Sequence, residues 1–271
     1  MRRASLILAL AAALGTMSLV DAPPVQAGSA WDEIRAGVFA GRIINPAGDA
    51  VILTAPFRPL DQRAVPIEVE AKFADGRSVR AVTIIVDQNP TPVAARFDIG
   101  GKREHLRVST LLRLNAGTDV RAIVEASDGQ LYMADRFVKF AGGQAACSAP
   151  PWGSPEQIAA TMGKMTLEPL GKRAAVTQIE PRARLKIMHP NHTGMVLDQL
   201  TLLYVPLRIV TDMEVRQGDE RVFALQGSIA MAQNPVVEFD YRANGAETLH
   251  VEARDSHGAA WARDFPVGQG S

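Results

Sequence analysis

Hydrophobic positions recur with two different periods along this chain. A helical spacing is confined to the start, where Trp31, Ile34 and Val38 fall on one face of a short helix. Farther along, apolar side chains alternate with polar ones, as in half-buried strands, and the clearest runs are 66–73, 106–114 and 120–126. Turn signals separate these runs at Asp75-Gly76, Asn115-Ala116-Gly117 and Asp128-Gly129. Residues 30–140 therefore predict a short helix followed by an antiparallel β-sandwich.

The same alternation returns in residues 182–268. Strands are expected at residues 183–188, 204–215, 221–225, 236–241, 248–254 and 260–267. Turns are expected at Gln217-Gly218, Asn244-Gly245 and His257-Gly258. No helical run long enough for a crossover connection interrupts these strands, which argues against a parallel α/β sheet. The sequence therefore predicts a second antiparallel sandwich and an all-β fold.

Residues 141–181 separate the two sandwiches and have a different composition. The interval contains residues that interrupt regular structure, namely Gly142-Gly143, Pro150-Pro151, Gly153, Gly163 and Gly171. One short helix is expected inside it, with Ser154 as N-cap, Pro155 in the first turn and Gln157 completing a capping box. We interpret the interval as a flexible Gly/Pro-rich linker between two domains.

The N-terminal segment predicts export. Arg2 and Arg3 precede an apolar stretch of about 17 residues, and a polar segment ending in Val25-Gln26-Ala27 follows. This order is typical of a cleaved signal peptide at residues 1–27, because the apolar stretch is near the short limit for a membrane anchor, which is the alternative. The arginine pair leaves open whether the Sec or the twin-arginine route is used. We expect an exported protein with no membrane segment after cleavage.

Composition excludes several classes of partner. Removal of residues 1–27 leaves 27 basic and 28 acidic residues, so the mature chain has a formal charge of −1. Such a chain offers no electrostatic footprint for nucleic acid or anionic lipid. No glycine-rich phosphate loop joins a strand to a helix, which argues against nucleotide chemistry. The mature length of about 244 residues suits two ordinary domains.

Cys147 is the only cysteine of the chain. Exported proteins usually hold an even number of cysteines or none, so this thiol is a buried small hydrophobe, an intermolecular disulfide partner or a working thiol. It lies among small residues in 141–150, with nothing large enough nearby in the sequence to bury it. Gly142 and Gly143 provide a hinge, and the seven residues after Phe140 would extend the sulfur about 23 Å from the sandwich. We predict an exposed, functional thiol with a pKa near its ordinary value of about 8.5.

Two other motifs contain residue types used in catalysis or metal binding. His189 and His192 have the spacing of a metal pair, but no third ligand is evident, so we interpret residues 189–194 as a polar turn. Asp255-Ser256-His257 contains the residues of a triad, yet neighbours in one tight turn cannot pass on a proton in the required geometry. We therefore expect neither catalytic residues nor a metal. A copper or zinc chaperone that uses both histidines and Cys147 remains an alternative.

Short motifs follow one another in a fixed order through both halves. The first half contains Thr54-Ala55-Pro56, Ala64-Val65-Pro66, the run 86–92 with Phe97, the run 128–132 and the closing Gly-Gly-to-Cys run. The second half contains His189-Pro190 with Thr193-Gly194, Tyr204-Val205-Pro206, Ile229 through Asn234-Pro235 to Phe239, and the run 255–258. In this order the motifs resemble the sulfur-oxidation carrier proteins SoxY and SoxZ joined in one chain.

The resemblance implies two immunoglobulin-like sandwiches, a SoxY-like domain at 30–140 and a SoxZ-like domain at 182–268. SoxY-like domains carry sulfur intermediates covalently on a cysteine in a Gly-Gly-Cys-Gly-Gly tail, which implies Cys147 as the attachment residue here. Three residues separate Cys147 from the paired glycines, and the chain continues past it. The thiol therefore lies on a loop tethered at both ends. His192 stands where the SoxZ-like motif is expected to have an acidic residue.

We therefore predict a periplasmic carrier that holds a sulfur-containing, thiol-reactive group on Cys147 and presents it to partner enzymes. It would perform no turnover itself and need no cofactor beyond that covalent adduct. The resemblance implies Sox-type enzymes as partners, or a quinoprotein dehydrogenase with its cytochrome c. The competing interpretation is a non-catalytic accessory module for such a quinoprotein (PQQ) dehydrogenase, with Cys147 incidental or used for a disulfide-linked dimer.

Overall fold

The computed structural model describes residues 30–140, 142–174 and 179–267. The predicted signal peptide, residues 1–27, lies outside these ranges. The N-terminal half of the described chain contains helix α1 (Ala30–Phe39) followed by β1 (Ile44–Pro46), β2 (Val51–Thr54), β3 (Val65–Lys72), β4 (Val79–Val86), β5 (Val93–Ile99), β6 (His105–Leu112), β7 (Thr118–Ala126) and β8 (Leu131–Val138). In β3 the apolar residues Val65, Ile67 and Val69 are buried while the residues between them lie toward solvent, as the alternation predicts.

Two short helical segments and the strands of the C-terminal half follow. They are η1 (Ala146–Ser148), α2 (Pro155–Thr161), β9 (Met165–Ala174), β10 (Ile179–Ile187), β11 (Val210–Gln217), β12 (Glu220–Gly227), β13 (Val236–Asp240), β14 (Thr248–Asp255) and β15 (Ala260–Pro266). The predicted capping box at α2 is confirmed, because the Ser154 side chain accepts from Gln157 N and the Gln157 side chain accepts from Ser154 N.

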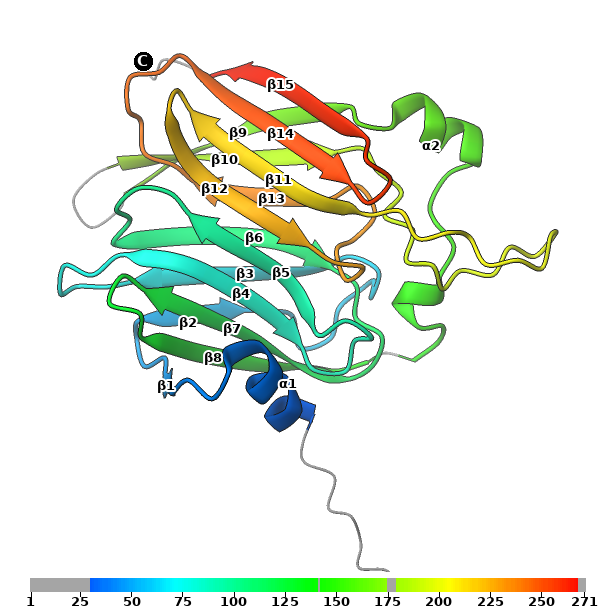
Figure 1. Ribbon diagram of the computed structural model, residues 1–271, viewed down its shortest axis with the longest axis horizontal. Helices are drawn as coiled ribbons and strands as arrows, with labels where there is room; N and C mark the ends of the chain where they lie inside the picture. Colours follow the sequence, from blue (N-terminus) through cyan, green and yellow to red (C-terminus); the bar gives the residue numbers. More distant parts are fainter. Residues whose placement is uncertain (1–29, 141, 175–178, 268–271) are drawn as a thin grey trace, which may run out of the picture.

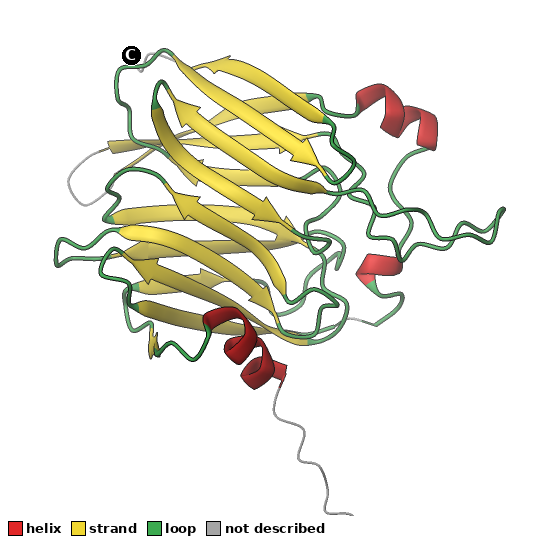
Figure 2. Ribbon diagram, viewed as in Figure 1, coloured by secondary structure: helices red, strands yellow, loops and turns green. Residues whose placement is uncertain are grey.

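The strands form two facing sheets that both run through the two halves (Figures 1 and 2). The nine-stranded sheet has the order β1-β8-β7-β4-β5-β12-β11-β14-β15, and the six-stranded sheet the order β2-β3-β6-β13-β10-β9. Strand β5 pairs antiparallel with β12, and β6 pairs antiparallel with β13. The two sandwiches therefore meet edge to edge, so that each half covers strand edges that the other would leave exposed.

The core is continuous across this junction. Phe97 of β5, Phe223 of β12 and Phe239 of β13 are fully buried, with successive ring centroids 5.8 and 5.1 Å apart. One cluster of buried apolar residues includes members from both halves. An aromatic side chain buries about 150–250 Å², so each ring contributes on the order of 4–6 kcal/mol as an upper value. Separating the halves would expose this aromatic row to water.

Helix α1 packs on the outer face of the nine-stranded sheet. Phe39 forms a second, smaller apolar cluster with residues of β4, β7 and β8. Trp31 and Ile34 pack against this cluster, as the helical spacing predicts. Val38 is 42 % exposed, because Phe39 takes the buried position in the last turn. The prediction for Val38 is therefore wrong.

Strand β9 lies inside the interval 141–181, where the sequence pattern predicts a linker. It contains Pro169 and Gly171, whose φ of 89° is unusual for a strand. Both are tolerated because β9 is the outer strand of its sheet and pairs only with β10 among the described strands. This part of the predicted linker is therefore a paired strand.

An apolar hairpin, residues 196–205, projects beyond the sheets at the end of the molecule that also carries η1 and α2 (Figure 1). The Asp198 carboxylate accepts from the amides of Leu200 and Thr201 at 2.9 and 2.8 Å, which closes the turn. Leu200 is 95 % exposed. A strand starting at residue 204 is not observed, because Tyr204 bridges to Leu197 in this hairpin and β11 starts only at residue 210.

None of the helices in the described ranges combines the length and the apolar character that crossing a bilayer requires.

Candidate functional site

Cys147 lies in η1, where the chain passes from one half to the other. It is a free thiol and only 1 % exposed. The prediction of an exposed thiol is therefore wrong. The small residues beside Cys147 in the sequence cannot cover its sulfur, but loops from both halves close over the turn.

Both halves of the molecule hold the backbone of Cys147. From the N-terminal half, Asn115 Oδ1 accepts from Cys147 N at 2.8 Å. From the C-terminal half, Thr193 Oγ1 donates to the carbonyl oxygen of Cys147. Farther along the same segment, Trp152 N donates to Gln233 Oε1 at 2.7 Å and Gln233 Nε2 donates to Trp152 O at 2.8 Å. The segment that carries the thiol is therefore fastened to both halves.

Asn89 supports the N-terminal side of this site. It lies in the motif 86–92 and is buried. Its Oδ1 accepts from Asn115 N at 3.0 Å, and its Nδ2 donates to Arg113 O at 2.7 Å. One motif residue thus fixes the end of β6, from which Arg113 and Asn115 reach the cysteine turn.

Asn191 supports the C-terminal side in the same way. This buried residue has a φ of 46°, in the left-handed region that asparagine tolerates better than most residues. Its Nδ2 donates to the carbonyl oxygens of Met231 and Ala232 at 3.3 and 3.1 Å, and its Oδ1 accepts from Val210 N at 2.9 Å. The loop after β12 is therefore held against the turn that carries Thr193.

Arg113 joins the two sides. It is 7 % exposed, and its Nη1 donates to the carbonyl oxygens of Ile229 at 3.2 Å and Met231 at 2.5 Å. Its positive charge lowers the pKa of the Cys147 thiol, against the larger effect of burial. Burial lowers the pKa of Arg113 to about 10, so the side chain remains charged at neutral pH. A buried positive charge therefore favours the thiolate form of Cys147.

Burial raises the pKa of the Cys147 thiol, and the Arg113 charge and the Asn115 hydrogen bond oppose this rise without cancelling it. The prediction of an ordinary pKa is therefore wrong. Because the thiolate is the reactive form of cysteine, a protonated and covered thiol is protected from attack and oxidation. The closed turn therefore shields the thiol rather than presenting it for reaction.

Gly142 and Gly143, the predicted hinge, precede the turn and are exposed. Their φ angles are 96° and 94°, values that other residues adopt only under strain. Both positions therefore require glycine in the closed turn. Movement about them stays a prediction.

His189 is a structural residue. Its ring is buried, with Nδ1 2.8 Å from Asn191 Oδ1 and Nε2 3.4 Å from Asp255 Oδ2. The same carboxylate accepts from Arg208 Nε at 2.7 Å. Burial lowers the pKa of His189, and also that of His192, which is partly buried. Both rings are therefore neutral at neutral pH.

The described residues do not bring His189, His192 and Cys147 together as a metal-ligand set. Among the described residues, His105, Glu180 and Asp240 do place their ligand atoms within 4.8 Å of one another, close enough to hold one metal ion. They lie at the junction of the two halves in the six-stranded sheet. Arginines already neutralise the two carboxylates, since Arg103 lies 2.8 Å from Glu180 and Arg182 lies 2.9 Å from Asp240. This cluster is a buried ion-pair network, in which a divalent cation would meet two positive charges.

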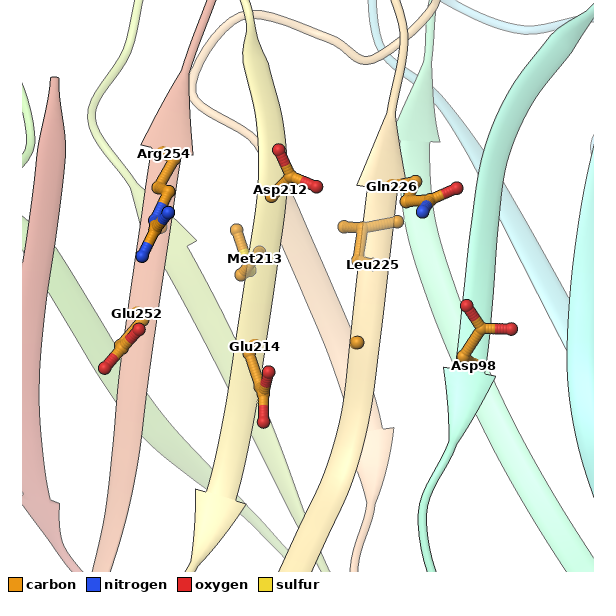
Figure 3. A pocket seen from close by; sticks show the side chains of 10 residues that line it. Asp98, Asp212, Met213, Glu214, Leu225, Gln226, Glu252 and Arg254 are labelled. Atoms are coloured by element: carbon orange, nitrogen blue, oxygen red, sulfur yellow. The ribbon is translucent and has the colours of Figure 1, made fainter. Parts of the chain in front are cut away.

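A shallow hollow on the outer face of the nine-stranded sheet is lined by four carboxylates, those of Asp98, Asp212, Glu214 and Glu252 (Figure 3). Glu214 pairs with two arginines, and Glu252 lies 3.2 Å from a histidine. The side chains line an open sheet face and share no residue with the cysteine site. We interpret the hollow as a solvated surface.

The sequence motifs do not reveal Arg113. Strand alternation places Leu112 and Leu114 inward, so Arg113 would face solvent. It is buried because the loop after β12, which lies more than a hundred residues later in the chain, covers that end of β6. An arginine two residues before the Asn115 turn is the only local signal.

Two family models match the chain. The model for sulfur oxidation protein SoxY matches residues 35–145, and the model for sulphur oxidation protein SoxZ matches residues 173–266. Arg113 and Asn115 lie within the first match and Thr193 within the second, whereas Cys147 lies two residues beyond the first. No curated protein matches the chain.

Two solved structures show partial likeness. The sulfur carrier protein SoxY from Chlorobium limicola f thiosulfatophilum is 27 % identical over 41 % of this chain and 92 % of its own, with a TM-score of 0.36. A superoxide reductase (neelaredoxin) from Ignicoccus hospitalis is 14 % identical over 40 % of this chain and 90 % of its own, with a TM-score of 0.27. The family models alone support the assignment. The chain joins a SoxY domain to a SoxZ domain and thus belongs to the fused SoxYZ-type sulfur oxidation proteins.

Proposed function

We propose that this protein is a periplasmic sulfur carrier that holds its cargo covalently on Cys147. The observation that carries the proposal is the construction of the cysteine site, because residues from both family domains converge on one turn. Asn115 and Arg113 come from the SoxY domain, and Thr193 comes from the SoxZ domain.

The transfer chemistry needs only the thiol. The Cys147 thiolate attacks the outer sulfur of a persulfide on a donor enzyme, forming a new sulfur–sulfur bond. The donor's own sulfur–sulfur bond breaks, and its inner sulfur leaves as a thiolate with the bonding pair. The step is neutral in redox terms, and its reversal delivers the sulfur to an acceptor. The carrier performs no turnover, and Sox-type enzymes act as donor and acceptor.

Loading of sulfur onto Cys147 requires the turn to open, because the closed turn covers the thiol and raises its pKa. Opening would break the Asn115 and Thr193 hydrogen bonds and let the segment move about Gly142 and Gly143. In the open loop, exposure would return the thiol pKa toward its ordinary value and increase the thiolate fraction. Since the loop is tethered at both ends, the partner must accept a loop rather than a free tail.

Replacement of Cys147 by serine in the producing organism tests the proposal. We expect Cys147→Ser to abolish thiosulfate-dependent oxygen uptake to the level of a strain that lacks the protein. Ser148→Ala is the matched control, because it alters the same turn but leaves the thiol, and it should retain uptake. Normal uptake with Cys147→Ser would contradict the carrier function and favour an accessory binding module.

A further inference from the structure

The apolar hairpin, residues 196–205, exposes large side chains at the end of the molecule that also carries Cys147 (Figure 1). Leu200 is 95 % exposed, and Leu202, Leu203 and Tyr204 are exposed as well. Asp198 is the only charged residue of the hairpin. A protein that works alone rarely leaves so many neighbouring apolar side chains in water, so such a surface indicates contact with a partner.

A second apolar patch, from the N-terminal half, lies beside the cysteine segment, residues 142–152. Phe57, in the loop between β2 and β3, is exposed, and its ring lies 6.4 Å from that of Phe137, which is also exposed. Just before the segment, Lys139 N donates to Phe57 O at 2.8 Å, and at its end the Arg63 guanidinium lies 4.4 Å from the Trp152 ring. This loop therefore contacts the chain at both ends of the cysteine segment.

The base of the hairpin is joined directly to the cysteine turn. Arg208 N donates to His192 O at 2.9 Å, which holds the two arms of the hairpin together. Thr193, the next residue of the first arm, donates to the carbonyl oxygen of Cys147 and accepts from Met195 N. A molecule bound to the hairpin is thus linked to the cysteine turn through one hydrogen bond.

The position and charge of these surfaces select among the possible occupants. The hairpin contains no lysine or arginine, the residues that attract anionic lipid surfaces. A symmetric pair of chains joined at this end would cover Cys147 in both copies and prevent its loading. An enzyme that exchanges sulfur with Cys147 must instead bring its own reacting sulfur to bonding distance of the thiol, so it has to lie against this end.

We propose that the apolar hairpin and the patch around Phe57 form the docking surface for the enzyme that loads sulfur onto Cys147. The enzyme contributes a complementary apolar surface beside its reacting sulfur, and the hairpin, which extends farthest from the sheets, is the main anchor. This inference rests on the proposed carrier function for the identity of the partner.

Leu200→Asp combined with Leu203→Asp tests the docking surface. The matched control is Ile43→Asp, because Ile43 is 77 % exposed and its neighbour Ile44 pairs with Leu131, at the end of β8 opposite the cysteine segment. Thiosulfate is added to producing cells, and intact mass follows the appearance of an adduct that reductant removes from Cys147. Burial of one leucine strengthens an interface about tenfold or more. We expect the double variant to load at least about tenfold more slowly than the wild type, and Ile43→Asp to load at the wild-type rate.

The purified double variant should match the wild type in urea unfolding and in alkylation of Cys147 by iodoacetamide, since both leucines are exposed. Faster alkylation would mean that the substitutions only open the turn, and it would overturn the proposal. A wild-type dimer in sedimentation that the double variant breaks would overturn it in favour of a second copy. Wild-type binding to phosphatidylglycerol vesicles that the double variant loses would overturn it in favour of a lipid surface.

The outcome in cells separates this proposal from the carrier function. Loading of the double variant at the wild-type rate would overturn the docking surface and leave the Cys147→Ser experiment untouched. An unmodified Cys147 in wild-type cells that oxidise thiosulfate would contradict the carrier function itself, and the docking surface with it.

Discussion

Removal of the Thr193 hydroxyl by Thr193→Val is expected to loosen the turn that holds Cys147. The hydroxyl donates to the Cys147 carbonyl oxygen and accepts from Met195 N at 3.2 Å. A hydrogen bond of this kind contributes about 1 kcal/mol net, which corresponds to about a fivefold change in the equilibrium between closed and open turn. Because the closed thiol is only 1 % exposed, it reacts mainly from the open turn, and its alkylation rate should rise by the same factor.

The assay is the rate of alkylation by iodoacetamide at fixed pH, followed by intact mass, with urea unfolding measured in parallel. Ser127→Ala is the matched control, because it removes a hydrogen bond between Ser127 Oγ and Ser78 N of 3.1 Å at the opposite end of β7. The nine residues of β7 place this end about 30 Å from the cysteine end of the strand. An unchanged rate in Thr193→Val, or an equal increase in Ser127→Ala, would refute local opening of the turn.

Three further predictions concern the stability of the fold, two at the junction and one at His189. Phe223→Ala should lower the free energy of unfolding by about 3–5 kcal/mol in urea titration, because Phe223 packs between rings of both halves. Gly100→Ala should cost about 1–3 kcal/mol in the same measurement, because its Cβ would lie 1.8 Å from the Arg221 carbonyl oxygen and push β12 away from β5. Burial lowers the pKa of His189, so the unfolded chain binds a proton below about pH 6.5 that the folded chain does not, and stability should fall as the pH falls through this range. His189→Gln should therefore flatten the dependence of unfolding free energy on pH between about 7 and 5, and an unchanged slope would contradict the assignment.

Many strand positions and the α2 cap could be predicted from the sequence because both depend on local patterns. Alternation at 66–73 and the Ser154 capping box involve residues a few positions apart, whose geometry local backbone preferences determine. The pairing of β5 with β12 could not be predicted. Alternation shows which face of a strand is buried but not which strand edge lies beside it.

The burial of Cys147 could not be predicted for a related reason. Its neighbours are small, so the local sequence offers nothing to cover the sulfur. The cover comes from the turn around Thr193 and the end of β6 around Asn115, which are distant in sequence and meet only in the fold. The same contacts bury Arg113, which alternation assigns to the surface. Family motifs were the stronger signal, since Asn89 and the 189–194 turn contain residues that build this site.

Intact-mass analysis of the protein isolated from its native cells without reductant tests the central claim most directly. A carrier in use should show a discrete mass increase, localised to the peptide that contains Cys147 and removed by reductant. A doubled mass that returns to the monomer on reduction would instead indicate a disulfide-linked dimer. A thiol that remains unmodified while the cells oxidise thiosulfate would contradict the proposal that Cys147 carries sulfur.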